Sequence, residues 1–142
     1  MRTWICFTFA ILFTYLSIAN PLEAQYENVE ENSFDTPIII DLNQDNLNLI
    51  WHSDRSAIIK VYHHDCHKCQ SLLPIFEELN LLYGHLYQFA QLDMEEEEDL
   101  TDALDITSLP TIIFIKDGYE VGRHIGPLNK AKFISKIKHY LE

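Results

Sequence analysis

The sequence predicts an α/β fold in which a central mixed β-sheet carries helices on both of its faces. Short β-branched runs alternate with helical stripes of apolar residues, and a hairpin followed by one more helix closes the chain. The chain has 142 residues, of which 47% are hydrophobic. This is enough for one globular domain with a core and too little for two.

The first half of the domain predicts a strand, a weak helix, a second strand and a longer helix. The isoleucines of 38–40 favour a strand, and the leucines of 42–50 lie loosely on one helical side. Residues 57–62 form a nearly continuous apolar run that is typical of a buried strand. Pro74 should kink the longer helix, which ends near Tyr83-Gly84. Its apolar stripe is Leu72, Leu73, Ile75, Phe76, Leu79 and Leu82.

The second half predicts a strand at 87–92, a helix that begins in the acidic run 95–99, and a buried strand at 111–116. Acids at a helix N-terminus meet the positive end of its dipole, which favours a solvated helix start over a metal site. Asp117-Gly118 predicts a tight hairpin whose return strand is 119–125. The last helix presents Leu128, Ala131, Ile134, Ile137 and Leu141 as one stripe.

The N-terminus has the layout of a secretory signal peptide. Residues 1–24 hold one cation, an apolar run and then small and polar residues, with possible cleavage after Ala19 or Ala24. The alternative is an uncleaved membrane anchor, for which the run is somewhat short. Residues 25–37 read as a flexible acidic lead-in, and 38–142 as the folded domain. We therefore expect an exported protein, periplasmic or secreted. The ER lumen is less favoured because no retrieval signal is seen.

The charge of the chain argues against two classes of partner. The formal net charge is -12, from 22 acids and 10 bases. Nucleic acids and anionic membranes attract basic patches, so we expect neither as a partner once the signal is removed. The acidity itself favours a soluble chain, which we expect to be a monomer.

The cysteines are too close together to staple the fold. Of three cysteines, Cys6 would leave with the signal, so the mature chain keeps Cys66 and Cys69. A bridge across so short a loop removes little chain entropy and adds little stability.

A metal site is one alternative for this stretch, HHDCHKCQ. Two thiolates with His63, His64 or His67 would suit zinc or copper. Helical geometry should turn His67 away from the thiols, and two histidines that extend a strand should point to opposite sides. We therefore expect no metal and no other cofactor.

In the order of its predicted strands and helices and in its motifs, the chain resembles the thioredoxin family over nearly all of its mature length. The cysteine pair follows a buried strand and opens a helix that contains Pro74. Ser108-Leu109-Pro110-Thr111 is similar to the family's cis-proline loop, and Lys116-Asp117-Gly118 and Gly126 match its hairpin and the glycine before its last helix. Together these motifs are far more specific than a lone CxxC. The resemblance implies a thioredoxin fold and a redox-active Cys66–Cys69 disulfide, with Leu109 and Pro110 binding an extended substrate.

The resemblance also implies a thiol-disulfide oxidoreductase whose partners are protein thiols and disulfides. Cys66 at the helix N-terminus would be the nucleophile, because the dipole favours its thiolate, and Cys69 would be the resolving thiol. Reductase, oxidase and isomerase directions all stay open. A non-catalytic binding module on the same scaffold is the main rival, since fold does not imply function.

Four residues beside the cysteines depart from the family pattern and are candidates for tuning the thiols. Asp65 stands where the family usually has tryptophan, and His67 and Lys68 lie between the cysteines. Lys60 stands where the family has a buried acid, and Gln91 replaces the lysine that often pairs with that acid. His67 and Lys68 favour a thiolate. Asp65 opposes it unless it caps the helix, and Lys60 acts as a base if buried or snorkels to solvent.

Overall fold

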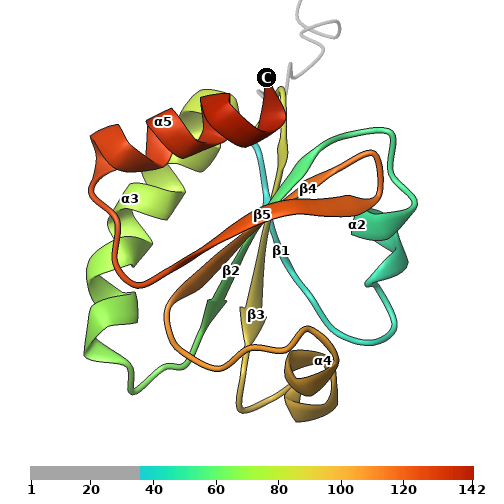
Figure 1. The fold of residues 1–142 in the computed structure, drawn as a ribbon, viewed down its shortest axis with the longest axis vertical. Coiled ribbons are helices and arrows are strands. Elements are labelled where there is room, and N and C mark those ends of the chain that lie inside the picture. Colours follow the sequence, from blue (N-terminus) through green and yellow to red (C-terminus); the bar gives the residue numbers. More distant parts are fainter. Residues whose placement is uncertain (1–35) are drawn as a thin grey trace, which may run out of the picture. The chain divides into compact units, whose positions relative to one another are not determined.

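The computed structural model describes residues 36–142, so the predicted signal peptide and most of the lead-in lie outside the described residues. Strands and helices alternate as expected before the closing hairpin and helix (Figure 1). The elements are β1 (Ile39–Asp41), α2 (Asn48–Trp51), β2 (Ala57–Tyr62), α3 (His67–Tyr83), β3 (Gln88–Asp93), α4 (Glu98–Ala103), β4 (Thr111–Lys116), β5 (Tyr119–Ile125) and α5 (Lys130–Leu141).

The strands form one mixed sheet in the order β1-β3-β2-β4-β5. Strand β2 pairs in parallel with β3, where Tyr62 lies opposite Asp93, and antiparallel with β4, where Val61 lies opposite Thr111. The hairpin β4–β5 turns through Asp117 and Gly118, which both have positive φ angles (53° and 78°). Asp-Gly is the pair that such a tight turn favours, as the sequence predicted.

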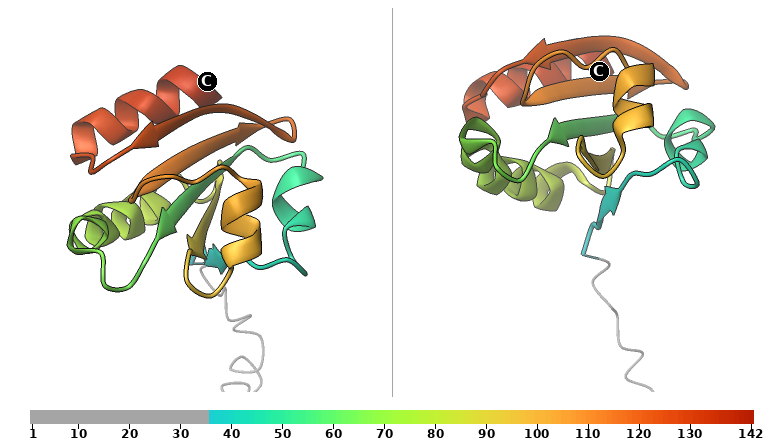
Figure 2. Two further views of the ribbon diagram at one scale, coloured as in Figure 1. Left: turned by 60° about the horizontal axis from the view of Figure 1, so that its bottom comes forward. Right: turned by 90° about the horizontal axis from the view of Figure 1, so that it is seen from below.

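Helices cover both faces of the sheet, which confirms the predicted architecture. Helices α3 and α5 lie on one side of the sheet and α2 and α4 on the other (Figures 1 and 2). Successive side chains of β2 point to opposite faces, so Ile58 joins the core under α3 and α5 while Ile59 joins the core under α2 and α4. This alternation divides the interior into two apolar layers.

Aromatic rings fill the layer between the sheet and helices α3 and α5. Phe133 of α5 is fully buried, with its ring centroid 6.2 Å from Phe76 of α3 and 6.3 Å from Phe114 of β4. Offset and edge-to-face aromatic pairs of this kind add to the energy of burial. The sequence stripe had placed Ala131 on the buried side of α5, but Ala131 is exposed and Phe133 takes the core position.

Two further helix predictions were only partly right. Leu73 and Leu82 of the predicted α3 stripe are 40% and 49% exposed, because the buried face of the helix is narrower than its apolar stripe. The predicted weak helix shrinks to the four residues of α2, and Leu49 within it is 56% exposed. Helix α4 begins only at Glu98, so Glu95 lies in the turn before it.

Two glycines are required by the local backbone in different ways. Gly126 has a φ of 101°, which side chains rarely adopt, at the junction before α5. Gly84 ends α3 with right-handed geometry, and a side chain there would collide with Pro37 and Asn80. The Asn80 amide also donates a hydrogen bond to the Pro37 carbonyl, so contacts with the domain begin just before β1.

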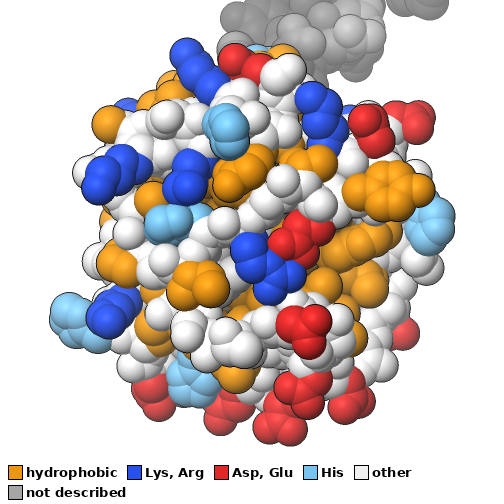
Figure 3. All heavy atoms as spheres, viewed as in Figure 1, with side chains coloured by type: hydrophobic (Ala, Val, Ile, Leu, Met, Phe, Trp, Pro, Cys, Tyr) orange, Lys and Arg blue, Asp and Glu red, His pale blue; other side chains and the backbone are white. Residues whose placement is uncertain are grey.

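The surface is unevenly charged. In the view of Figure 3 acidic side chains gather at the lower edge, near α4, whereas most of the basic side chains lie over the upper left, near α5. Helix α4 carries Glu98 and Asp99 in its first turn, as the sequence predicted. Among residues 36–142, no helix has the length and apolar character needed to span a membrane.

Replacing Phe133 with alanine should lower the free energy of unfolding by about 3–5 kcal/mol, because it leaves a cavity among buried aromatic rings. Tyr119→Ala is the matched control: Tyr119 is 75% exposed, and its removal should change stability by less than about 0.5 kcal/mol. Urea unfolding followed by fluorescence measures both, and equal effects of the two substitutions would contradict this packing.

Candidate functional site

The two cysteines lie where β2 ends and α3 begins. Cys66 is the N-cap of α3, and its Sγ accepts a hydrogen bond from the backbone N–H of Cys69 at 3.2 Å. The Cys66 N–H in turn donates to the His63 carbonyl at 3.0 Å, which closes the turn after the strand. The two sulfurs are joined in a disulfide, with the Cα atoms 5.2 Å apart. The local hydrogen bonds therefore hold the bridge at the positive end of the α3 dipole.

The two sulfur-bearing residues differ in exposure. Cys69 is only 4% exposed because it lies one turn inside α3, whereas Cys66 is half-buried at the helix start. His67 and Lys68, which separate them, are both exposed. Another protein can therefore approach Cys66 much more readily than Cys69.

The Leu109–Pro110 peptide bond is cis, as the sequence resemblance implied. Strand β4 starts directly after it, and the pairing of Thr111 with Val61 brings this loop to the edge of the sheet where β2 runs into the cysteine turn. The Pro110 carbonyl accepts a hydrogen bond from the Gly126 N–H at 2.8 Å, and Leu109 packs against the core under α2 and α4. The loop is therefore anchored from both sides.

Asp65 does not cap the helix, contrary to one of our two expectations for it. The N-cap is Cys66, and the Asp65 side chain is 81% exposed with Oδ2 at 3.6 Å from Nε2 of His64. Its backbone N–H donates to Nδ1 of His63 at 3.0 Å. A carboxylate in this position is screened by water, so its effect on the thiols is weak.

Lys60 is buried under α3 and does not snorkel to solvent. It is 2% exposed, and its Nζ lies 4.8 Å from the ring centroid of Tyr62 and 5.0 Å from that of Phe76. Burial lowers the pKa of Lys60 from 10.5 to about 8, and the nearby charges of Glu77 and Asp41 raise it by less. A fraction of the amine is therefore unprotonated near neutral pH.

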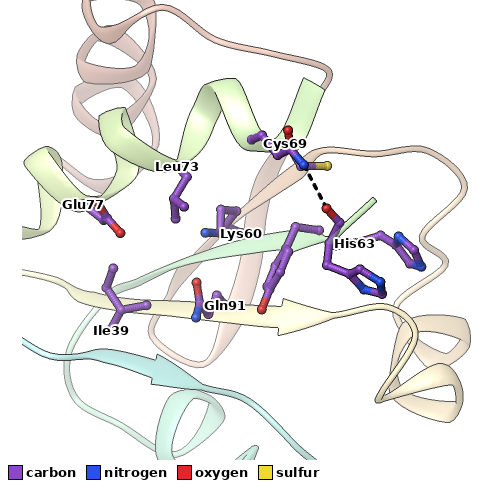
Figure 4. A pocket seen from close by; sticks show the side chains of 10 residues that line it. Ile39, Lys60, His63, Cys69, Leu73, Glu77 and Gln91 are labelled. Atoms are coloured by element: carbon purple, nitrogen blue, oxygen red, sulfur yellow. Dashed lines mark hydrogen bonds between the residues drawn. The ribbon is translucent and has the colours of Figure 1, made fainter. Parts of the chain in front are cut away.

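Lys60 and the buried cysteine line the same cavity. The cavity has a volume of about 440 Å³ and lies between α3 and the strands β1, β2 and β3 (Figure 4). Gln91, which stands in place of the family's lysine, lies across from α3 and donates a hydrogen bond to Asp41 at 2.6 Å. The wall is formed by Ile39, Lys60, Tyr62, His63, His64, Cys69, Gln70, Leu73, Glu77 and Gln91. Sequence reasoning missed Glu77, which reaches the cavity from one turn beyond Leu73.

His63 and His64 lie side by side, so the expectation that they point to opposite sides is wrong. Strand β2 ends at Tyr62, and beyond it the strand alternation no longer applies. The two rings stack with centroids 4.5 Å apart, and both contact Glu95 at 3.1 Å. The acidic run was interpreted as a solvated helix start, but its first residue, Glu95, lies before α4 and contacts both histidines.

Comparisons with known proteins agree with this fold and site. Residues 38–139 match the family model described as Thioredoxin. A thioredoxin of Borreliella burgdorferi is 37% identical over 87 residues, which is 61% of this chain and 74% of that protein. The chloroplastic thioredoxin Y1 of Arabidopsis thaliana is 29% identical over 94 residues, or 66% of this chain and 55% of that protein.

A solved structure gives the same result for the fold. The crystal structure of Malassezia sympodialis thioredoxin superposes with a TM-score of 0.67 at 20% identity, covering 73% of this chain and 91% of the other. The domain has the thioredoxin fold, and the chain belongs to the thioredoxin family. With its Cys66–Cys69 pair it is a protein-disulfide oxidoreductase.

The buried amine makes stability depend on pH. Because the pKa of Lys60 is lower in the folded chain than in the unfolded chain, the unfolded chain binds more protons between about pH 8 and about pH 10.5. Below about pH 8 the folded chain has to bury the charged amine, so the cost to its stability is largest there. The cost falls as pH rises, because the buried amine loses its proton. Relative to Lys60→Met, the oxidised wild-type chain should gain up to about 3 kcal/mol between about pH 7 and about pH 10.

Urea unfolding of both chains at each pH measures this difference. Lys68→Met is the control, since Lys68 is exposed and its removal takes no charge out of the interior. If Lys60→Met and Lys68→Met show the same pH dependence, Lys60 is not buried as described.

Proposed function

We propose that the protein exchanges its Cys66–Cys69 disulfide or dithiol with protein substrates, with Cys66 as the nucleophile and Cys69 as the resolving thiol. The observation that carries the proposal is the difference in exposure between the half-buried Cys66 at the start of α3 and the buried Cys69. A substrate sulfur can reach the first and not the second.

Reduction of a substrate would proceed in two balanced steps. The Cys66 thiolate attacks one sulfur of the substrate disulfide, which releases one substrate thiolate and forms a mixed disulfide. The Cys69 thiolate then attacks Cys66 Sγ, which releases the second substrate thiolate and restores the Cys66–Cys69 bond. Oxidation of a substrate dithiol is the reverse sequence. The N–H of Cys69 directed at Cys66 Sγ, and the charges of His67 and Lys68 when protonated, support a Cys66 thiolate.

Leu109 and Pro110 are the proposed substrate-binding residues. An extended substrate segment would pair with the backbone of Leu109. Pro110 has no backbone N–H, so it would not compete with Leu109 for that pairing. The antiparallel pairing of β2 with β4 supports this role, because it brings the loop and the cysteine turn to the same edge of the sheet.

Lys60 is proposed as the proton acceptor for Cys69. The resolving step needs a Cys69 thiolate, and a buried thiol gives up its proton only to a nearby base. Lys60 lines the same cavity as Cys69, and burial lowers its pKa to about 8, so the neutral amine is accessible near physiological pH. The amine of Lys60 would thus act as the base at the position where the family has a buried acid.

The direction of the reaction depends on the reduction potential of the pair. Family potentials run from about −270 mV for reductases to about −120 mV for oxidases. His67 and Lys68 favour the oxidising end, and the exposed Asp65 opposes them weakly. Equilibration of the Cys66–Cys69 pair with glutathione measures its reduction potential and so assigns the direction.

We also propose that the protein is exported, as the signal-peptide layout of residues 1–24 indicates.

Cys66→Ser should abolish the reduction of insulin by dithiothreitol that the natural chain accelerates, because the accessible nucleophile is lost. Cys69→Ser should instead accumulate a mixed disulfide between Cys66 and the substrate, which non-reducing electrophoresis detects. In the unprocessed chain, Cys6→Ser is the matched control and should retain activity, because Cys6 lies in the predicted signal peptide. Equal turnover by the natural chain and Cys66→Ser would leave a non-catalytic binding module as the better description.

Lys60→Met should flatten the pH profile of the resolving step. In the natural chain the rate at which Cys69 releases substrate from the mixed disulfide should rise through about pH 8, as the Lys60 amine loses its proton. Rapid-quench measurement of the release step gives the profile, and a fall of about 10²-fold near neutral pH is expected for the loss of a general base. An unchanged profile in Lys60→Met would exclude the amine as the base.

A further inference from the structure

Three side chains of metal-binding types meet on the surface next to the turn that joins β2 to Cys66. Within residues 36–142, His63, His64 and Glu95 are the one group of three His, Cys, Asp or Glu residues whose ligand atoms all lie within 4.8 Å of one another. Nε2 of His63 and Nδ1 of His64 each lie 3.1 Å from the same Glu95 oxygen, Oε2.

The sheet topology brings these residues together from distant parts of the chain. Strands β2 and β3 are parallel, so their carboxyl ends meet at one edge of the sheet. The histidines follow β2 directly, and Glu95 follows β3 in a turn that the Met94 N–H ties to the Tyr62 carbonyl at 2.9 Å. Stacking of the two imidazole rings, inclined by only 18°, then aims one nitrogen of each at the carboxylate.

We propose that His63, His64 and Glu95 form a binding site for a divalent transition-metal ion such as zinc. Zinc prefers imidazole nitrogen and carboxylate oxygen at about 2.0–2.1 Å in a tetrahedron, which sets adjacent ligand atoms about 3.3 Å apart. Two of the three edges, at 3.1 Å, are already close to that length. The edge between the two histidine nitrogens is no longer than 4.8 Å, and a fourth position stays open for water or another ligand.

Asp65 lies beside both histidines, with its carboxylate near His64 and its backbone N–H hydrogen-bonded to His63. Its carboxylate lies 3.6 Å from Nε2 of His64, the nitrogen opposite the proposed ligand atom, which is too far for a hydrogen bond but places negative charge beside that ring. Its N–H, however, donates to Nδ1 of His63, which leaves the His63 proton on Nε2. Metal binding at Nε2 moves that proton to Nδ1 and releases the Asp65 N–H to water, so it alters the turn that leads to Cys66.

The surroundings favour a cation. A surface hollow of about 330 Å³ opens beside the cluster and gives access from solvent, and its walls include two further carboxylates. The whole chain carries a net charge of -12, which raises the local concentration of cations. The hollow is lined by His63, Met94, Glu95, Glu98, Thr101 and Asp102.

Zinc titration of the oxidised full chain by isothermal calorimetry tests the site. The Cys66–Cys69 disulfide removes both thiols as ligands, and prior alkylation of Cys6 removes the third. We expect one equivalent of zinc at about pH 7.5 and loss of binding at about pH 5, because imidazoles must be deprotonated to bind metal. Proton spectra should show His63 and His64 ring signals shifting together as zinc is added.

Matched variants separate this site from general binding to an acidic surface. Glu95→Gln and His64→Gln should each weaken zinc binding by at least about tenfold. Glu96→Gln and His85→Gln remove the same groups from exposed positions outside the cluster and should leave the affinity within about twofold. The proposal is overturned if the natural chain binds no zinc, or if Glu95→Gln and Glu96→Gln bind it equally. Thermal unfolding of each oxidised variant verifies that it is folded.

Discussion

The position of β2 in the sheet is the constraint on which the rest of the molecule depends. Its parallel pairing with β3 and antiparallel pairing with β4 leave the residues after β2, those after β3 and those before β4 at one edge. The cysteine turn, the Glu95 turn and the Leu109–Pro110 loop are these segments. Because helices α3 and α5 pack on one face and α2 and α4 on the other, this edge is where chemically active side chains reach solvent.

The parts of the fold that sequence could predict are those governed by local rules. The apolar runs of β2 and β4 reflect strands buried on both faces, and Asp117-Gly118 marks its hairpin through backbone geometry alone. The cis Leu109–Pro110 bond and the Cys66–Cys69 bridge were available only through the resemblance to a family. Local rules erred where burial depends on what packs opposite, as when Phe133 took the core position expected of Ala131.

The parts of the site that sequence could not predict depend on where the strand ends and on what lies across it. Alternation along β2 would separate the rings of His63 and His64, but β2 ends at Tyr62 and the rings stack. Glu95 belonged to a run explained by a helix dipole, although the helix starts three residues later, at Glu98. The parallel order of β2 and β3 was the signal that could have joined these residues, since it predicts which loops become neighbours.

Charge divides the region around the disulfide into an inner and an outer environment. Inside, Lys60 lies against the rings of Tyr62 and Phe76 and the cavity wall, so burial lowers its pKa, which supports its proposed role as a base. Outside, the half-buried His63 and the exposed His64 both contact Glu95, and water screens the charges that lie farther away. His63 belongs to both environments, because its carbonyl accepts the Cys66 N–H while its ring contacts Glu95. We therefore expect a change in how that ring is held to reach Cys66, the N-cap of α3, through this backbone hydrogen bond.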